Sequence, residues 1–355
     1  MSIVDRSTRG ASTLLRTLAL VALAGALSAC PRFQRSMAEL PRRPEHVEVG
    51  RERIFVLQQG AGDKTPLLLV HGYGSSTHAY KRVLPALARD RRVIAIDLPG
   101  FGHSDKLERD YSPAALAHTV ARLLRKLKVP RVDVVGHSWG ASVALALTLA
   151  HPERVRRLVL IGAWVFEEQL PPFILWSRAP LVGEILYGLF YDQRADDRME
   201  LAFYDATPFV APANVDRARK AFDAPGAIAA ALAAARGQRF SAMQTRYRRI
   251  VQPALLIWGR QDRVSHLEYG QRLASLLPNA QLEVIDRCGH VPQLEHPKRV
   301  ARLIRRFIER AREDVTWKSP EPQKPRSGAP ATKPAKKTPA KNAPASRPAA
   351  PRPTR

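Results

Sequence analysis

Short apolar runs alternate with amphipathic stretches through most of the chain. Runs rich in Val, Ile and Leu predict buried strands at residues 53–58, 66–72, 91–100, 132–135, 156–163, 253–259 and 281–286. Stretches with apolar residues at helical spacing predict helices near residues 77–88, 112–129, 141–150, 266–277 and 297–311. Buried strands that alternate with helices are typical of a mostly parallel central sheet with helices on both faces. The predicted fold class is therefore α/β.

The stretch 164–250 interrupts this alternation. It contains several aromatic residues and the run "AIAAALAAA", and no part of it has a convincing strand pattern. Because strands resume directly after it, we interpret it as a helical cap over the C-terminal edge of the sheet, rather than as a second independent domain. The core is then divided into a first part at 45–163 and a second part at 251–313.

The N-terminus has the pattern of an export signal. Arginines at positions 6, 9 and 16 accompany an apolar stretch at 17–27. That stretch is too short to span a bilayer, which takes about 20 apolar residues. Residues 1–29 are therefore predicted to be a signal peptide.

The four residues "LSAC" that end at Cys30 resemble a bacterial lipobox. The resemblance implies a lipoprotein-type signal, lipidation of Cys30 and a tether over residues 30–44. The mature protein would then be an exported, membrane-anchored lipoprotein that faces the periplasm or the cell surface. An ordinary signal peptide followed by a chance cysteine is the alternative.

The C-terminal tail differs in composition from the rest of the chain. The whole chain has a formal net charge of +25. Residues 318–355 contain 10 prolines, 10 Lys or Arg residues and the single acidic residue Glu321. Without an apolar face, this tail is predicted to be extended and disordered. It is either a solvated spacer or a segment attracted to an anionic envelope surface. Nucleic acid is a less suitable partner, because the tail has no aromatic residue for stacking.

The segment "VDVVGHSWGA" at 132–141 places a serine between two glycines, after a strand pattern and before a helix pattern. In a sharp turn, Ser138 would adopt a strained backbone conformation, and Gly136 and Gly140 would provide the clearance. The hydroxyl would then stand clear of the sheet at a helix N-terminus, where a nucleophile would lie. A Gly/Ser loop without function is the alternative.

Five motifs occur in an order that resembles a known family: "HGYG" at 71–74, "DLPGFGHSD" at 97–105, "GHSWG" at 136–140, "WGRQDRV" at 258–264 and "CGHVPQLEHP" at 288–297. In this order they resemble the α/β-hydrolase superfamily, of the capped serine hydrolase or esterase type. The resemblance covers about residues 45–313. It implies an α/β-hydrolase fold with a mostly parallel central sheet and acyl-serine chemistry.

The resemblance also implies a catalytic triad. Ser138 would be the nucleophile and His290 the base that takes its proton. Asp262, after the strand at 253–259, would hold and stabilise the imidazolium. Glu167 is the alternative acid, and Asp286 is interpreted as a structural turn residue.

By the same resemblance, the backbone N–H groups of Tyr73 and Trp139 would form an oxyanion hole. Their side chains are expected to line the acyl pocket, with simple core packing as the alternative. Cys288 is interpreted as a small buried residue.

The sequence therefore predicts a serine hydrolase that cleaves an acyl bond of a small-molecule substrate, in the first place a carboxylic ester. Cleavage of a carbon–carbon bond, an amide or a lactone, or perhydrolysis, is the alternative within the fold. A catalytically inactive binding lipoprotein is the alternative of another class. No cofactor or metal is expected, because the sequence contains no H-E-x-x-H, no paired cysteine motif and no complete G-x-G-x-x-G.

Overall fold

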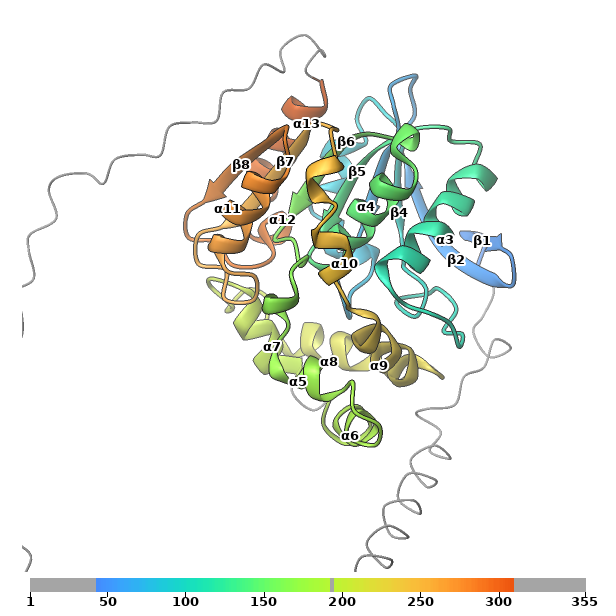
Figure 1. Cartoon of the computed structure of the whole chain (residues 1–355), viewed down its shortest axis with the longest axis vertical. Coiled ribbons are helices and arrows are strands. Elements are labelled where there is room, and N and C mark those ends of the chain that lie inside the picture. The colour runs from blue at the N-terminus through green and yellow to red at the C-terminus, as the bar shows by residue number, and fades with distance from the viewer. Residues whose placement is uncertain (1–42, 192–194, 310–355) are drawn as a thin grey trace, which may run out of the picture. The chain divides into compact units, whose positions relative to one another are not determined.

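The computed structural model describes residues 43–191 and 195–309. Eight strands form one sheet in the order β1-β2-β4-β3-β5-β6-β7-β8 (Figure 1). The strands are β1 (His46–Val49), β2 (Glu52–Gln59), β3 (Leu67–Val70), β4 (Val93–Ile96), β5 (Val132–His137), β6 (Val155–Ile161), β7 (Ala254–Gly259) and β8 (Ala280–Ile285). Strand β2 runs antiparallel to both of its neighbours, and the pairs from β4 to β8 are all parallel. The predicted mostly parallel α/β sheet is confirmed.

Helices pack on both faces of the sheet, as predicted. Along β3, Leu68 and Val70 point into one hydrophobic cluster and Leu67 and Leu69 into another, because successive side chains of a strand alternate between faces. The first cluster includes buried residues of α3 (Pro113–Lys126), α4 (Trp139–Ala150) and α11 (Leu267–Leu276). The second includes buried residues of α2 (Leu84–Leu87) and α13 (Pro297–Glu309). The short elements η3 (Pro152–Arg154) and α12 (Pro292–Glu295) complete the described core.

Three of the predicted elements have wrong bounds. The helix expected near 77–88 consists of the 3₁₀ turn η2 (Thr77–Tyr80) and the single turn α2. Pro85 lies in the first turn of α2, and a proline has no N–H to continue a helix that begins earlier. The strands expected at 66–72 and 91–100 end at Val70 and Ile96. The residues that follow them leave the sheet and form loops at its carboxyl edge.

In the described part of the segment interpreted as a cap, the regular elements are all helical and are joined by turns and loops. Its elements are η4 (Glu167–Gln169), α5 (Pro172–Trp176), α6 (Val182–Ile185), the π-helix η5 (Leu186–Phe190), α7 (Ala195–Ala202), α8 (Pro212–Lys220), α9 (Ala227–Gly237), α10 (Ser241–Gln244) and η6 (Tyr247–Arg249). Figure 1 shows α5 to α9 gathered below the sheet. We refer to the segment from η4 to η6 as the cap.

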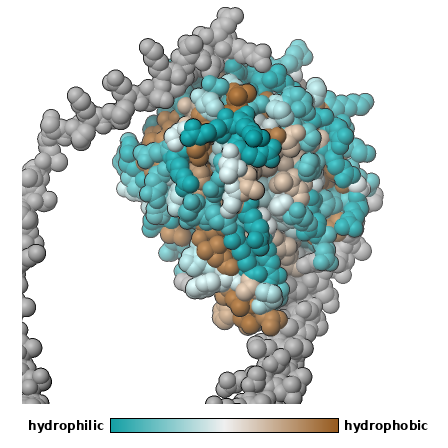
Figure 2. All heavy atoms as spheres, in the orientation of Figure 1, coloured by the Kyte–Doolittle hydropathy of each residue, from teal (hydrophilic) through white to brown (hydrophobic). Residues whose placement is uncertain are grey.

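Part of the cap surface is apolar. Trp176 is 62% exposed and Phe190 is 53% exposed. Figure 2 shows hydrophobic residues at the lower end of the molecule, where Figure 1 places α6. The exposed apolar residues of α5, α6 and η5 are Leu175, Trp176, Val182, Leu189 and Phe190.

Several predictions concern parts of the chain outside the described residues. These parts are the signal peptide at 1–29, the lipidation site Cys30, most of the tether at 30–44, the end of the core at 310–313 and the tail at 318–355. Within the described ranges, no helix combines the length and the apolar character needed to cross a bilayer.

Candidate active site

Ser138 lies in the strained turn that the sequence predicts. It connects β5 to α4 with φ 52° and ψ −122°, a conformation that non-glycine residues rarely adopt. A Cβ atom on Gly140 would lie 2.3 Å from the carbonyl oxygen of Val70, so only glycine fits there. Ser138 therefore stands at the N-terminus of α4, at the carboxyl edge of the sheet. It is 4% exposed.

His290 and Asp262 form a buried pair at the same edge. The distance between His290 Nδ1 and Asp262 Oδ2 is 2.9 Å. The other carboxylate oxygen of Asp262 accepts hydrogen bonds from the backbone N–H groups of Val264 and Ser265, at 2.9 and 2.8 Å. Because an ionised carboxylate can only accept, Nδ1 of His290 carries the proton and Nε2 is left as the basic nitrogen.

The turn that carries Ser138 contacts the loop that carries His290. His137, directly before Ser138, donates through Nε2 to the carbonyl oxygen of His290 at 2.9 Å. Burial lowers the pKa of His137 to about 3, with a further contribution from the nearby His290, so its ring is neutral. Within residues 43–191 and 195–309, no hydrogen bond joins Ser138 Oγ to His290 Nε2. Such bonds are often long before a substrate binds.

The other two carboxylates considered from the sequence bond elsewhere. Glu167 accepts from Arg178 Nη2 at 2.6 Å and from the backbone N–H of Phe240 at 2.9 Å. Asp286 is exposed and pairs with Arg260, which lowers the pKa of the Asp286 carboxyl. Of the three candidate acids, Asp262 is the one that lies within hydrogen-bond distance of His290.

His71 orients the loop that carries Tyr73. The backbone N–H of Leu98 donates to His71 Nε2 at 2.9 Å, so the proton of this ring is on Nδ1, which donates to the carbonyl oxygen of Gly72 at 2.7 Å. Burial lowers the pKa of His71, which favours this neutral form. The peptide between Gly72 and Tyr73 is thereby held in one orientation. The sequence analysis placed His71 in a motif but did not identify this role.

Two backbone donors lie beside the nucleophile. In the described part of the chain, the N–H groups of Tyr73 and Trp139 donate no hydrogen bond. A Cβ atom on Gly72 would lie 3.0 Å from the Cβ of Ser138, so the Tyr73 loop packs directly against the serine. Donors without a partner near a nucleophile are what an oxyanion hole requires.

The side chains of Tyr73 and Trp139 belong to an aromatic cluster between the core and the cap. Their rings lie 5.8 Å apart, and the ring of Phe101 lies 5.6 Å from each. Tyr73 Oη donates to the carbonyl oxygen of Ala231 at 2.7 Å and lies 2.8 Å from Tyr187 Oη. Because Tyr73 donates its only hydroxyl proton to Ala231, Tyr187 must be the donor in the hydrogen bond between the two phenols.

The cluster continues into the cap. The rings of Tyr187 and Tyr191 stack with centroids 4.5 Å apart, and the guanidinium of Arg198 lies 4.5 Å from the centroid of Tyr191. Burial raises the pKa of Tyr73, Tyr187 and Tyr191, so all three phenols stay protonated. The sequence analysis missed Tyr187, Tyr191 and Arg198. The spacing of four residues between the tyrosines, which places both on one face of a helix, is the signal that could have found the first two.

The cap also contacts the loop of the candidate base. The backbone N–H of His290 donates to the carbonyl oxygen of Ala202, the last residue of α7, at 2.7 Å. Cys288, two residues earlier, is fully buried, and burial raises the pKa of its thiol. This agrees with the interpretation of Cys288 as a small buried residue.

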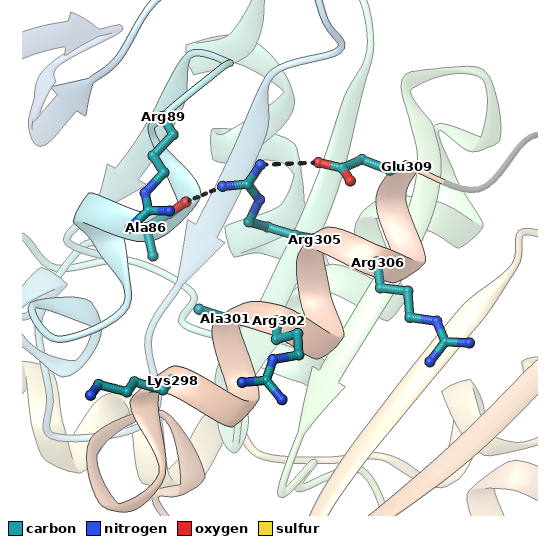
Figure 3. A pocket seen from close by; sticks show the side chains of 8 residues that line it. All are labelled: Ala86, Arg89, Lys298, Ala301, Arg302, Arg305, Arg306 and Glu309. Carbon is teal, nitrogen blue, oxygen red and sulfur yellow. Dashed lines mark hydrogen bonds and ion pairs between the residues drawn. The ribbon is translucent and has the colours of Figure 1, made fainter.

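No grouping of three or more His, Cys, Asp or Glu residues suited to a metal ion occurs in the described ranges. An open groove of about 750 Å³ lies on another part of the molecule, along α13 (Figure 3). None of its lining residues belongs to the triad or to the aromatic cluster.

Known proteins resemble the chain over this same region. The family described as alpha/beta hydrolase fold matches residues 65–297. The chain is 33% identical over 285 residues to 2-hydroxymuconate semialdehyde hydrolase of Pseudomonas sp. (strain CF600), covering 74% of this chain and 95% of that protein. It is 34% identical over 260 residues to 2-hydroxy-6-oxo-2,4-heptadienoate hydrolase of Pseudomonas putida, covering 70% and 90%. A solved meta-cleavage product hydrolase from Pseudomonas fluorescens IP01 has a TM-score of 0.64 and 27% identity, covering 76% of this chain and 98% of that one.

Proposed function

The chain belongs to the α/β-hydrolase fold family, and from that premise we propose that it is a serine hydrolase that cleaves the carbon–carbon bond beside the ketone of a small keto acid. The observation that carries the proposal is Ser138 in its strained turn, in contact with the loop of the His290–Asp262 pair. The bond type is supported by the two curated relatives, because one name describes a semialdehyde and the other an oxo acid as the compound that is hydrolysed.

In the proposed reaction, Ser138 Oγ attacks the ketone carbon while His290 Nε2 takes its proton. Asp262 stabilises the imidazolium that forms. The backbone N–H groups of Tyr73 and Trp139 stabilise the negative oxygen of the tetrahedral intermediate. The carbon–carbon bond then breaks, and the imidazolium of His290 gives its proton to the departing carbon. Water activated by His290 hydrolyses the acyl-serine and releases a carboxylic acid.

The nature of the leaving group separates this reaction from ester hydrolysis, which is the first expectation from the sequence. An ester releases an alkoxide, whereas a ketone releases a carbanion, which forms only when conjugation spreads its charge. The 2-hydroxydienoate in the name of the second relative provides such a system once its enol has become a ketone, losing the hydroxyl proton and gaining one at C5, because the departing C5 is then conjugated through the C3–C4 double bond with the ketone at C2. The similarity to these relatives therefore supports the carbon–carbon alternative better than the ester.

The test compares two substrates on one preparation. We expect 2-hydroxy-6-oxo-2,4-heptadienoate to be cleaved with a higher kcat/KM than p-nitrophenyl butyrate. Hydrolysis of the ester alone would instead assign the protein as an esterase.

The role of Ser138 is tested in the same assay. Ser138→Ala should lose both activities, and a fluorophosphonate probe should label the wild type at Ser138 only. If folded protein is not labelled and neither substrate is turned over, the chain is an inactive binding lipoprotein or a protein of another class.

We also propose that Cys30 is lipidated and holds the enzyme at a membrane. The support is the signal-like stretch at 1–29 and the "LSAC" sequence that ends it. At high salt, which screens electrostatic attraction to the membrane, Cys30→Ala should move the enzyme from the membrane fraction to the soluble fraction without changing kcat. If Cys30→Ala stays in the membrane fraction and is processed like the wild type, lipidation at this position is excluded.

A further inference from the structure

A groove lined by cations lies between the end of α2 and helix α13. Five basic side chains and one carboxylate line it: Arg89, Lys298, Arg302, Arg305, Arg306 and Glu309. Figure 3 shows Lys298, Arg302 and Arg306 along one side of α13, with Arg89 and Arg305 across from them. With a volume of about 750 Å³, the groove has room for a phosphorylated group.

Most of these cations have no anionic partner in the described part of the chain. Arg305 donates to the carbonyl oxygen of Ala86 at 3.2 Å and lies 3.5 Å from Glu309 and 3.6 Å from Asp90. Within residues 43–191 and 195–309, the other four basic side chains take part in no hydrogen bond or ion pair. Within these ranges, the charges of four of the five cations are therefore not compensated by a carboxylate.

The spacing of the basic residues along α13 destabilises this helix when no anion is bound. Lys298, Arg302 and Arg306 follow one another at intervals of four residues, which places them about 6 Å apart along the helix axis. Like charges at this spacing repel one another and destabilise a helix. The apolar side chains of α13 are buried in the core, so its solvent side is charged. An external anion would remove the repulsion.

We propose that this groove binds the phosphate groups of an anionic phospholipid surface. Guanidinium groups form paired hydrogen bonds with phosphate oxygens, and four of the five cations are arginines. No aromatic side chain lines the groove to stack on a base, which disfavours a single-stranded nucleic acid. Because the groove offers no large apolar side chain for insertion, binding would be peripheral and sensitive to salt.

Binding through this groove would fix the orientation of the protein relative to the membrane. Figure 1 shows α13 at one end of the described structure and α6 of the cap at the other. A membrane against α13 would leave the cap facing water, where a soluble substrate can reach it. The proposal is independent of the reaction that the enzyme catalyses.

The test measures binding of the full chain to phosphatidylcholine vesicles with and without phosphatidylglycerol, at low salt. All variants carry Cys30→Ala, so that lipidation plays no part. The groove variant is Arg302→Gln with Arg306→Gln, two exposed residues. The matched control is Arg125→Gln with Lys126→Gln, two exposed cations on α3. A third variant, Trp176→Ser with Phe190→Ser, removes apolar side chains from the cap surface.

Each cation near an anionic membrane contributes roughly a fivefold change in affinity. We therefore expect the groove variant to bind phosphatidylglycerol vesicles about 25-fold more weakly, and the α3 control to change by less than about twofold. Equal losses in both would show that only the total charge matters and would overturn the proposal. Loss confined to the cap variant would overturn it too, because the membrane would then dock through the cap.

Inorganic phosphate distinguishes a lipid headgroup from a free phosphate. At equal ionic strength, replacing chloride by phosphate should raise the thermal stability of the wild type and of the groove variant to the same extent, because phosphate stabilises folded proteins in general. If phosphate stabilises the wild type more than the groove variant, and vesicles are not bound, the groove is a site for a soluble phosphorylated ligand and the membrane proposal is wrong.

Discussion

The phenol oxygen of Tyr187 in the cap lies 2.8 Å from the phenol oxygen of Tyr73 in the core. Tyr73 also donates to the carbonyl oxygen of Ala231 in α9. The backbone N–H of Tyr73 is one of the two proposed oxyanion donors. The side chain of Tyr73 thus connects the position of the cap to the geometry of the oxyanion hole, so that a displaced cap would also displace a catalytic donor.

Tyr187→Phe should therefore reduce kcat. The substitution removes the hydrogen bond to Tyr73, and a bond of this kind is worth about 1 kcal/mol, or roughly fivefold in rate. The ring still stacks on Tyr191, so KM should change little. Steady-state kinetics of the variant, with thermal unfolding as a check of folding, measure the effect.

Tyr269→Phe is the matched control, because it removes a phenol hydrogen bond to the carbonyl oxygen of Glu168 at the outer surface. It should leave kcat unchanged. If both variants lose kcat equally, the connection through Tyr73 has no particular role.

Asp262→Asn should abolish most of the activity. An amide in place of the carboxylate cannot stabilise the imidazolium and favours the wrong tautomer of His290, a change that costs about 10⁴-fold in kcat in a serine triad. Glu167→Gln should keep at least half of the wild-type kcat, because Glu167 bonds to Arg178 and Phe240 instead. The reverse ranking in a side-by-side assay would assign the acid to Glu167.

Arg198→Gln should weaken the binding of acidic substrates and leave the binding of neutral substrates unchanged. Its guanidinium lies over Tyr191 at the border of the aromatic cluster, where it can attract a substrate carboxylate. For the heptadienoate we expect KM to rise about tenfold, which corresponds to one charge-assisted hydrogen bond of about 1.4 kcal/mol. For p-nitrophenyl butyrate, which has no charge, KM should stay within twofold. An equal rise for both would mean that Arg198 only supports the cap.

Stability should fall in acid because two buried histidines are held neutral. Burial lowers the pKa of His71, and that of His137 to about 3, below the ordinary histidine value. Below about pH 6.5 the unfolded chain therefore takes up protons that the folded chain does not, and the free energy of unfolding decreases. For His137 this loss continues until about pH 3. Each histidine contributes a slope that approaches about 1.4 kcal/mol per pH unit.

Urea unfolding at a series of pH values from about 7 to about 4 measures this slope. Histidines of the unfolded chain take up their protons as the pH falls through this range. His137→Gln should have a shallower slope than the wild type. His118→Gln, at an exposed position of α3, should keep the wild-type slope. If His137→Gln also keeps it, the burial of His137 does not control the acid sensitivity.

Features that depend on neighbouring residues were predictable from the sequence alone. The alternation of apolar runs and amphipathic stretches indicated the parallel sheet and its helices. The glycines at 136 and 140 indicated the turn of Ser138, because clearance around a sharp turn is a local property. The edge strand β1 was missed, since four residues with one buried side chain leave little periodic signal.

Contacts between distant parts of the chain were decided by the tertiary structure. The sequence favoured Asp262 only through a resemblance and left Glu167 open as the acid. Packing brings Asp262 to His290 across 28 positions and commits Glu167 to Arg178. The bond between Tyr73 and Tyr187 spans 114 positions, and the groove of α13 joins side chains from two separate helices. Local patterns determine which elements form, but the packing of those elements against one another decides which side chains meet.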